Sequence, residues 1–171
     1  MKVNKPIFAI QTDNTINFIS KNFDFFTTGF KENTGSRILA FVPAVRLESL
    51  GDESFKKRHK LKYPYIAGAM ANGITSAAMV KTMAHNGMMG FFGAGGLSIK
   101  KIEENIIDLK TCLKDMPFGF NLIHSLGDPD HEMATIDLYL RHGITRISAA
   151  AFMRITPALV YYRIKGIYRD S

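Results

Sequence analysis

The stretch YPYIAGAMANGITSAAMVKTMAHNGMMGFFGAGGL, residues 63–97, decides the fold of this chain. It predicts buried strands at 63–67 and 88–92, joined by a helix at 74–85, with a glycine-rich turn after each strand. Asn86-Gly87 ends the helix, because either residue adopts the left-handed conformation common at helix C-termini. Two apolar strands joined through a helix form a parallel, right-handed unit. Both turns then lie at the end of the sheet where parallel α/β folds bind ligands.

The alternation of strand and helix continues along the chain. The further predicted elements are helices at 99–114, 129–142 and 157–166, strands at 117–123 and 144–149, and a strand beginning at Ile167. Ser98 is the predicted cap of the first of these helices, and Thr156-Pro157 starts the last. The apolar stripe predicted for the helix at 99–114 is Ile102, Ile106, Leu109 and Leu113. Strict alternation favours an α/β fold in which residues 63–171 form the first four βα units of a (β/α)₈ TIM barrel. The alternative is a four-stranded open sheet. A complete barrel needs about 250 residues, so the end at Ser171 is expected to be a truncation.

Residues 1–62 lack this alternation and are expected to form an N-terminal extension. A short strand is predicted at 6–10 and a turn at Asp13-Asn14. Residues 37–45 form an apolar run, and Pro43 marks its end or an edge position.

Composition sets the class of protein. The chain has 171 residues, 46% hydrophobic and 22% charged, which is typical of one soluble globular domain. Its net charge of +7 favours anionic partners such as phosphate-bearing cofactors or acidic carrier proteins. The basic run at 56–62 lacks interleaved aromatic residues, which favours a solvated helix face over a nucleic-acid contact. Cys112 is the only cysteine, so a disulfide framework is excluded. No signal peptide or membrane span is expected, and a cytoplasmic setting fits.

The segment 93–98, GAGGLS, invites comparison with a dinucleotide-binding fingerprint. Ser98 stands where that fingerprint needs a third glycine, and the next strand ends in Asn121-Leu-Ile-His124 without a carboxylate. A different use fits these turns better than dinucleotide binding: their backbone N–H groups face a flat polar ring system. The alternative is that the glycines only form tight turns of the barrel. The small residues that would let a ring approach the backbone are Gly68, Ala69, Gly93 and Gly95.

Three polar residues follow the later predicted strands. Asn121 has an amide that both donates and accepts, as recognition of an N–C=O ring edge requires, or it caps a loop. His124 lies at the same mouth, as a catalytic residue or as a surface or supporting histidine. Ser148 is a weaker pocket candidate. No catalytic triad, carboxylate pair or metal cluster has suitable spacing.

Four separated blocks carry a family resemblance: LGDESFKKRHKLKYPYIAGAMANGITS, GMMGFFGAGGLS, PFGFNLIHS and DLYLRHGITRISAAAFMRITPALVYYR. They resemble the PfaD-type trans-acting enoyl reductases of polyunsaturated fatty acid and trans-acyltransferase polyketide synthases, within the nitronate monooxygenase-like FMN-dependent TIM barrels. The resemblance covers roughly residues 40–171. It implies an enzyme that takes hydride from NADPH onto FMN and passes it to an enoyl thioester on an acyl carrier protein.

The resemblance also assigns residues. The positions that it implies for FMN binding are Gly68, Ala69, Met70, Ala71, Asn72, Gly93, Ala94, Gly95 and Asn121. It places the catalytic histidine and the FMN phosphate loops later than Ser171, which leaves His124 as the candidate within this chain. These residues alone are therefore expected to be inactive. The alternatives are a nitronate monooxygenase and a truncated, non-catalytic binding protein.

Overall fold

The computed structural model describes residues 4–20, 36–125 and 127–166. The chain forms two compact units, Met1–Asp52 and Glu53–Ser171. The strand predicted from Ile167 lies outside the described residues. No helix in the described part of the chain is long and apolar enough to cross a membrane.

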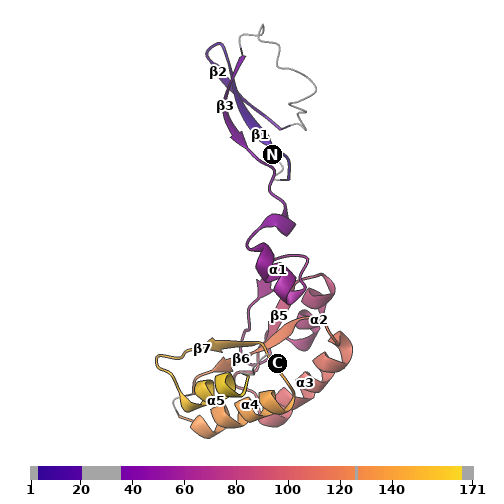
Figure 1. The fold of residues 1–171 in the computed structure, drawn as a ribbon, viewed down its shortest axis with the longest axis vertical. Helices are drawn as coiled ribbons and strands as arrows, with labels where there is room; N and C mark the ends of the chain where they lie inside the picture. The colour runs from indigo at the N-terminus through magenta and orange to yellow at the C-terminus, as the bar shows by residue number, and fades with distance from the viewer. Residues whose placement is uncertain (1–3, 21–35, 126, 167–171) are drawn as a thin grey trace, which may run out of the picture. The chain divides into compact units, whose positions relative to one another are not determined.

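The first unit contains an antiparallel sheet of β1 (Ile7–Thr12), β2 (Thr15–Ile19) and β3 (Ser36–Val42), in the order β2-β1-β3 (Figure 1). The predicted first strand and the predicted Asp13-Asn14 turn are confirmed, and Asp13 has a positive φ of 53°. β2 was not predicted, although a short turn between two alternating runs is a hairpin pattern. A short 3₁₀ helix, η2 (Leu47–Ser49), follows β3.

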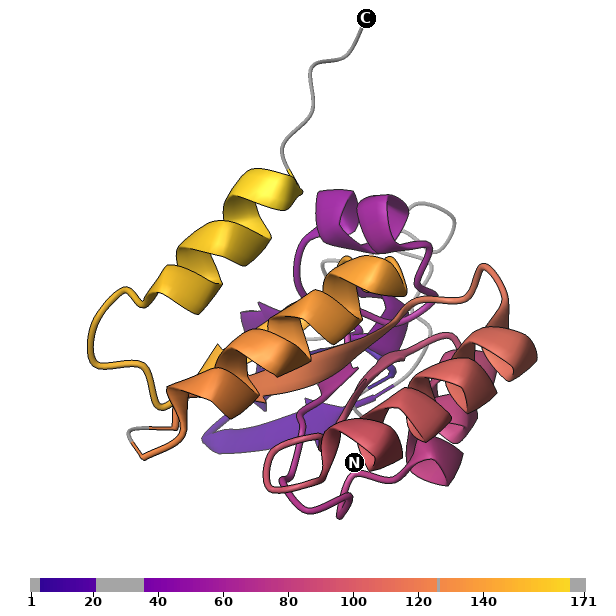
Figure 2. The same ribbon diagram turned by 90° about the horizontal axis from the view of Figure 1, so that it is seen from below.

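The second unit is a parallel sheet covered by helices. Its strands are β4 (Ile66–Ala67), β5 (Met89–Phe92), β6 (Phe118–Ile123) and β7 (Ile147–Ala150), in sequential order. Its helices are α1 (Glu53–His59), α2 (Ala77–His85), α3 (Ile99–Leu113), α4 (Pro129–Arg141) and α5 (Pro157–Lys165). All neighbouring strands are parallel, which confirms the predicted half barrel. Figure 2 shows α3 and α4 lying along one face of this sheet.

The core lies between the sheet and its helices. The predicted apolar stripe of α3 is buried at all four positions, Ile102, Ile106, Leu109 and Leu113. They pack with Phe92 and Phe120 from the sheet and with Ile136 and Tyr139 from α4. Each fully buried large apolar side chain contributes about 1.5–3 kcal/mol. Because this core covers one face of the sheet, only side chains on the opposite face are available for a site there.

A smaller cluster lies on the other face of the sheet. Leu61, Met89 and Phe91 form it, with Phe55 of α1 packed against them. Residues 53–62 therefore pack within the second unit, whereas the expected extension reached residue 62.

Three predicted elements begin three residues later than expected. Strand β4 begins at Ile66, not at residue 63. Helix α2 begins at Ala77, not at residue 74, because the Ser76 hydroxyl accepts from the Met79 N–H as an N-cap. Strand β7 begins at Ile147, not at residue 144, since the Ile144 N–H donates to the Tyr139 C=O and closes the turn after α4.

Candidate functional site

Side chains of a strand alternate between the two faces of a sheet. In β6, Phe120 and Leu122 point into the helix layer. Asn121 and Ile123 therefore lie on the opposite face, which we call the inner face. Ser148 of β7 pairs directly with Asn121 and shares this face.

The carboxyl ends of β4 and β5 continue into a first turn, residues 68–76, and a second turn, residues 93–98. Hydrogen bonds join these turns directly. The Asn72 N–H donates to the Gly95 C=O at 2.7 Å, and the Gly73 N–H donates to the Gly93 C=O at 2.8 Å. The two glycine-rich turns that were predicted to share one rim therefore form one continuous backbone surface.

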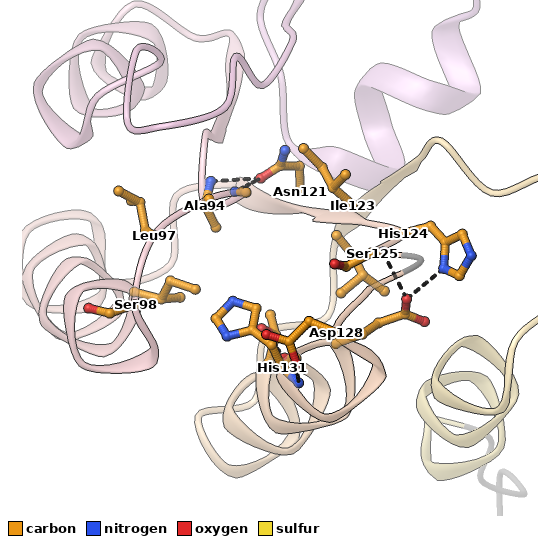
Figure 3. Close-up of a pocket in the computed structure, with 15 residues that line it drawn as sticks. Ala94, Leu97, Ser98, Asn121, Ile123, His124, Ser125, Asp128 and His131 are labelled. Carbon is orange, nitrogen blue, oxygen red and sulfur yellow. Dashed lines mark hydrogen bonds and ion pairs between the residues drawn. The ribbon is translucent and has the colours of Figure 1, made fainter.

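Asn121 ties the second turn to β6. Its side chain Oδ1 accepts the Ala94 N–H at 2.6 Å and the Gly95 N–H at 3.1 Å, and the residue is only 3% exposed. The Tyr139 hydroxyl donates to the Asn121 C=O at 2.7 Å and fixes the backbone. Asn121 Nδ2 forms no hydrogen bond within the described part of the chain. Figure 3 shows this nitrogen pointing away from Ala94 and from His131.

The structure narrows the set of backbone donors available to a ligand. Several N–H groups of the predicted FMN-binding turns donate within the protein, namely those of Met70, Asn72, Gly93, Ala94 and Gly95. Among the assigned residues, the N–H groups of Gly68, Ala69 and Ala71 have no such bond within the described part of the chain. Together with Asn121 Nδ2, these are the donors that the assigned residues leave available.

The glycines of the two turns serve different purposes. A Cβ added at Gly93 would collide with the Met70 carbonyl, so Gly93 is required for the close approach of the turns themselves. A Cβ added at Gly68 would meet nothing within 4 Å. Gly68 thus borders open space, as the approach of a ligand requires.

His124 belongs to a separate network at the end of β6. Its Nδ1 lies 2.8 Å from Oε2 of Glu132, which is 4% exposed, and its ring stacks on Phe152 with centroids 5.1 Å apart. Glu132 also accepts from the Ser125 N–H at 3.4 Å and from the Thr156 hydroxyl at 2.7 Å. Burial by itself raises the pKa of Glu132, but the hydrogen bonds from Thr156, His124 and Ser125 outweigh burial and lower it. Because an ionised carboxylate only accepts, His124 Nδ1 carries the proton of this pair.

A cavity of about 440 Å³ lies beside this network, between the first turns of α3 and α4 (Figure 3). Its polar lining includes Ser98, Ser125, Asp128 and His131. Asp128 caps α4 by accepting the His131 N–H at 2.9 Å. Ile102 and Leu122 from the helix side line it, and so do Asn121 and Ile123, so the cavity extends around the carboxyl end of β6. No group of three metal ligands occurs among the residues that the structure describes.

Two residues with central contacts were not singled out from the sequence. Thr75, within the predicted helix 74–85, is fully buried and bonds to both turns. Glu132 resembled an ordinary acid in the first turn of a helix, where such residues are common. Neither carries a local pattern that distinguishes it, because their partners come from other elements.

The parallel sheet, its helices and this rim define the class: part of a (β/α) barrel with a candidate ligand site at the carboxyl edge of the sheet. The family model for nitronate monooxygenase matches residues 52–164. The chain therefore belongs to the nitronate monooxygenase family.

Relatives come from polyketide and polyunsaturated fatty acid synthesis, which confirms the predicted resemblance. The polyketide biosynthesis protein ThaF of Burkholderia thailandensis is 45% identical over 75% of this chain and 11% of its own length. The polyketide biosynthesis protein PksE of Bacillus subtilis is 43% identical over 74% of this chain and 17% of its own length. The enoyl reductase domain of MlnA from the macrolactin cluster of Bacillus amyloliquefaciens superposes with a TM-score of 0.69 at 40% identity. That match covers 73% of this chain and 29% of the MlnA chain. The chain thus spans less than a third of each of these relatives.

Proposed function

We propose that the protein carrying this chain is an FMN-dependent enoyl reductase, and that these residues supply the first half of its flavin site. The observation that carries the proposal is the arrangement of Asn121. Its Oδ1 holds the second turn, while its Nδ2 has no partner among the described residues and lies beside the inner face. Asn121 Nδ2 is not among the buried side-chain atoms that lack a partner, so a ligand can reach it, and an acceptor on the edge of a flavin ring matches this donor.

The proposed contacts follow from the donors and the open space at the rim. The residues assigned to the flavin are Gly68, Ala69, Met70, Ala71, Asn72, Gly93, Ala94, Gly95 and Asn121. Among them, the N–H groups of Ala69 and Ala71 and the Nδ2 of Asn121 donate to the ring system. Gly68 leaves room for the ring, and the second turn acts indirectly by holding Asn121 and the first turn in place.

FMN supplies hydride-transfer chemistry between NADPH and the β-carbon of an enoyl thioester, whose α-carbon takes up a proton. The substrate is proposed to arrive on an acyl carrier protein. Two observations support this partner. The relatives include polyketide biosynthesis proteins and a polyunsaturated fatty acid synthase subunit, and the chain has a net charge of +7 that favours an acidic partner.

The family name motivates a second activity, the oxidation of alkyl nitronates. A protein that contains this chain should be loaded with FMN and assayed in parallel for NADPH-dependent reduction of a crotonyl thioester and for oxygen uptake with an alkyl nitronate. Thioester reduction without nitronate oxidation is expected. The reverse pattern would assign the second activity. If the protein bound no FMN and showed neither activity, the non-catalytic binding protein would be the remaining alternative.

A substitution at Asn121 tests the donor itself. Asn121→Asp keeps an oxygen for the Ala94 and Gly95 N–H groups but replaces the Nδ2 donor with an acceptor. FMN affinity should fall at least about tenfold, because a mismatched buried polar contact costs about 1–3 kcal/mol. The matched control is Asn105→Asp on the exposed face of α3, which should leave FMN affinity unchanged. Unchanged affinity in Asn121→Asp would contradict the assignment.

A further inference from the structure

Thr75 is the most connected residue of the first turn. Its side chain is fully buried, at 0% exposure. Its hydroxyl donates to the Gly68 C=O at 2.9 Å and accepts the Met70 N–H at 2.8 Å. Its own N–H donates to the Met70 C=O at 3.2 Å, and its C=O accepts the Gly93 N–H at 3.0 Å. One residue therefore closes the first turn and attaches it to the end of β5.

These bonds act on the part of the turn that contains the Ala69 and Ala71 N–H groups, which have no hydrogen-bond partner among the described residues. The two bonds of the hydroxyl bracket Ala69, and the bond between the Thr75 N–H and the Met70 C=O precedes Ala71. Both alanine N–H groups are donors that the protein itself leaves available. Their direction depends on the conformation of residues 68–72, which the hydroxyl of Thr75 determines more directly than any other side chain in the described chain.

We propose that Thr75 is a positioning residue for the flavin site. Its hydroxyl orients the Ala69 N–H toward the bound ring, and its backbone N–H, by holding the Met70 C=O, orients the Ala71 N–H. This rests on the proposed function. Thr75 itself does not touch the ligand, because it is enclosed by the two turns and by the start of α2. If Thr75 had only a structural role, removing its hydroxyl would change stability alone. In a positioning role, removing the hydroxyl also lowers the affinity for the ligand.

The test compares Thr75→Val, which removes the hydroxyl at nearly constant shape, with Thr75→Ser, which keeps it. Thr135→Val is the matched control, because Thr135 is also buried and its hydroxyl bonds only to the His131 C=O within α4. In a protein that contains this chain, FMN affinity should fall at least about tenfold in Thr75→Val, since two buried partners lose their bonds. It should stay within about threefold of the parent in Thr75→Ser and in the control, because both keep the bonds at the turn.

Amide hydrogen exchange without flavin gives an independent measurement. The Met70 N–H should lose protection in Thr75→Val and keep it in Thr75→Ser. If Thr75→Val does not fold, the parent protein still provides a test, because its Thr75 hydroxyl proton should exchange slowly and lie close to the Met70 N–H in NMR spectra. Failure to see this proton, unchanged Met70 protection, or unchanged FMN affinity in a folded Thr75→Val would each overturn the proposal. An absence of FMN binding to the parent protein would instead refute the proposed function, while the exchange data would still report on the turn.

Discussion

Glu132 offers the sharpest test of how the rim is held together. It is a buried carboxylate that accepts hydrogen bonds from three residues at two elements: His124 and Ser125 at the end of β6, and Thr156 at the N-cap of α5. Replacing it by Gln removes the charge and places an amide NH₂ group, which can only donate, against side chains and an N–H that also donate. The substitution keeps the volume, so the effect reports on hydrogen bonding and charge rather than on packing.

The expected loss follows from these contacts. A hydrogen bond to a charged group contributes about 1.5–3 kcal/mol, and removing one partner of a buried ionic contact costs about 3–5 kcal/mol. Gln retains one acceptor oxygen, which still serves Thr156 or His124. Glu132→Gln should therefore lower the free energy of unfolding by about 2–4 kcal/mol at pH 7.

The pH dependence has a definite sign. The pKa of Glu132 is lowered in the folded protein, against about 4.3 for an unfolded glutamate. The ionised group therefore stabilises the fold above about pH 4.3, and this contribution is lost as the pH falls through the folded-state value. The difference between the parent protein and Glu132→Gln should accordingly shrink below about pH 4.

Urea unfolding followed by circular dichroism at pH 7 and at several acidic pH values measures both effects. The control is Glu104→Gln, whose carboxylate forms an exposed pair with Lys101 at 3.0 Å. That variant should change stability by less than about 0.5 kcal/mol. A loss below about 0.5 kcal/mol in Glu132→Gln, or a difference that persists unchanged at low pH, would refute the reasoning.

Further expectations concern packing. Gly93→Ala should destabilise the second unit by about 1–3 kcal/mol, because the new methyl group would collide with the Met70 carbonyl. Gly68→Ala should leave stability unchanged, because its methyl group meets nothing within 4 Å. Equal effects of the two substitutions in urea unfolding would contradict the packing of the turns. Ile106→Ala should lower the free energy of unfolding by about 2–5 kcal/mol, because Ile106 is fully buried. Ile107→Ala, at the exposed neighbouring position, should change thermal unfolding much less. A larger effect of Ile107→Ala than of Ile106→Ala would show that the other face of α3 is buried.

Much of the fold was predictable because its determinants are local. The apolar spacing of α3 placed Ile102 and Ile106 in the core, and Ser98 caps that helix as predicted, accepting the Lys101 N–H at 3.3 Å. The Thr156-Pro157 start of α5 is likewise confirmed. Periodicity and capping act over three to four residues, so one stretch of chain contains the whole pattern. Strict alternation of such elements then favoured a parallel sheet.

The candidate site was predictable only in outline. The alternation of strands and helices brought Asn121 and both glycine-rich turns to one edge of the sheet, as predicted. Their hydrogen bonds join residues far apart in sequence, such as Asn121 and Ala94, and no local pattern encodes which oxygen meets which N–H. Only the folded chain therefore shows that the N–H groups of Gly93, Ala94 and Gly95 already donate within the protein. The same holds for the pairing of His124 with Glu132.

The sequence by itself thus determined the class of fold, the capped starts of α3 and α5, and the edge of the sheet at which Asn121 and both glycine-rich turns meet. Tertiary structure decided which polar groups remain available at that edge. The physical reason is that a buried donor or acceptor must find a partner, and the partners of Thr75, Asn121 and Glu132 come from elements that meet only when the sheet and its helices pack.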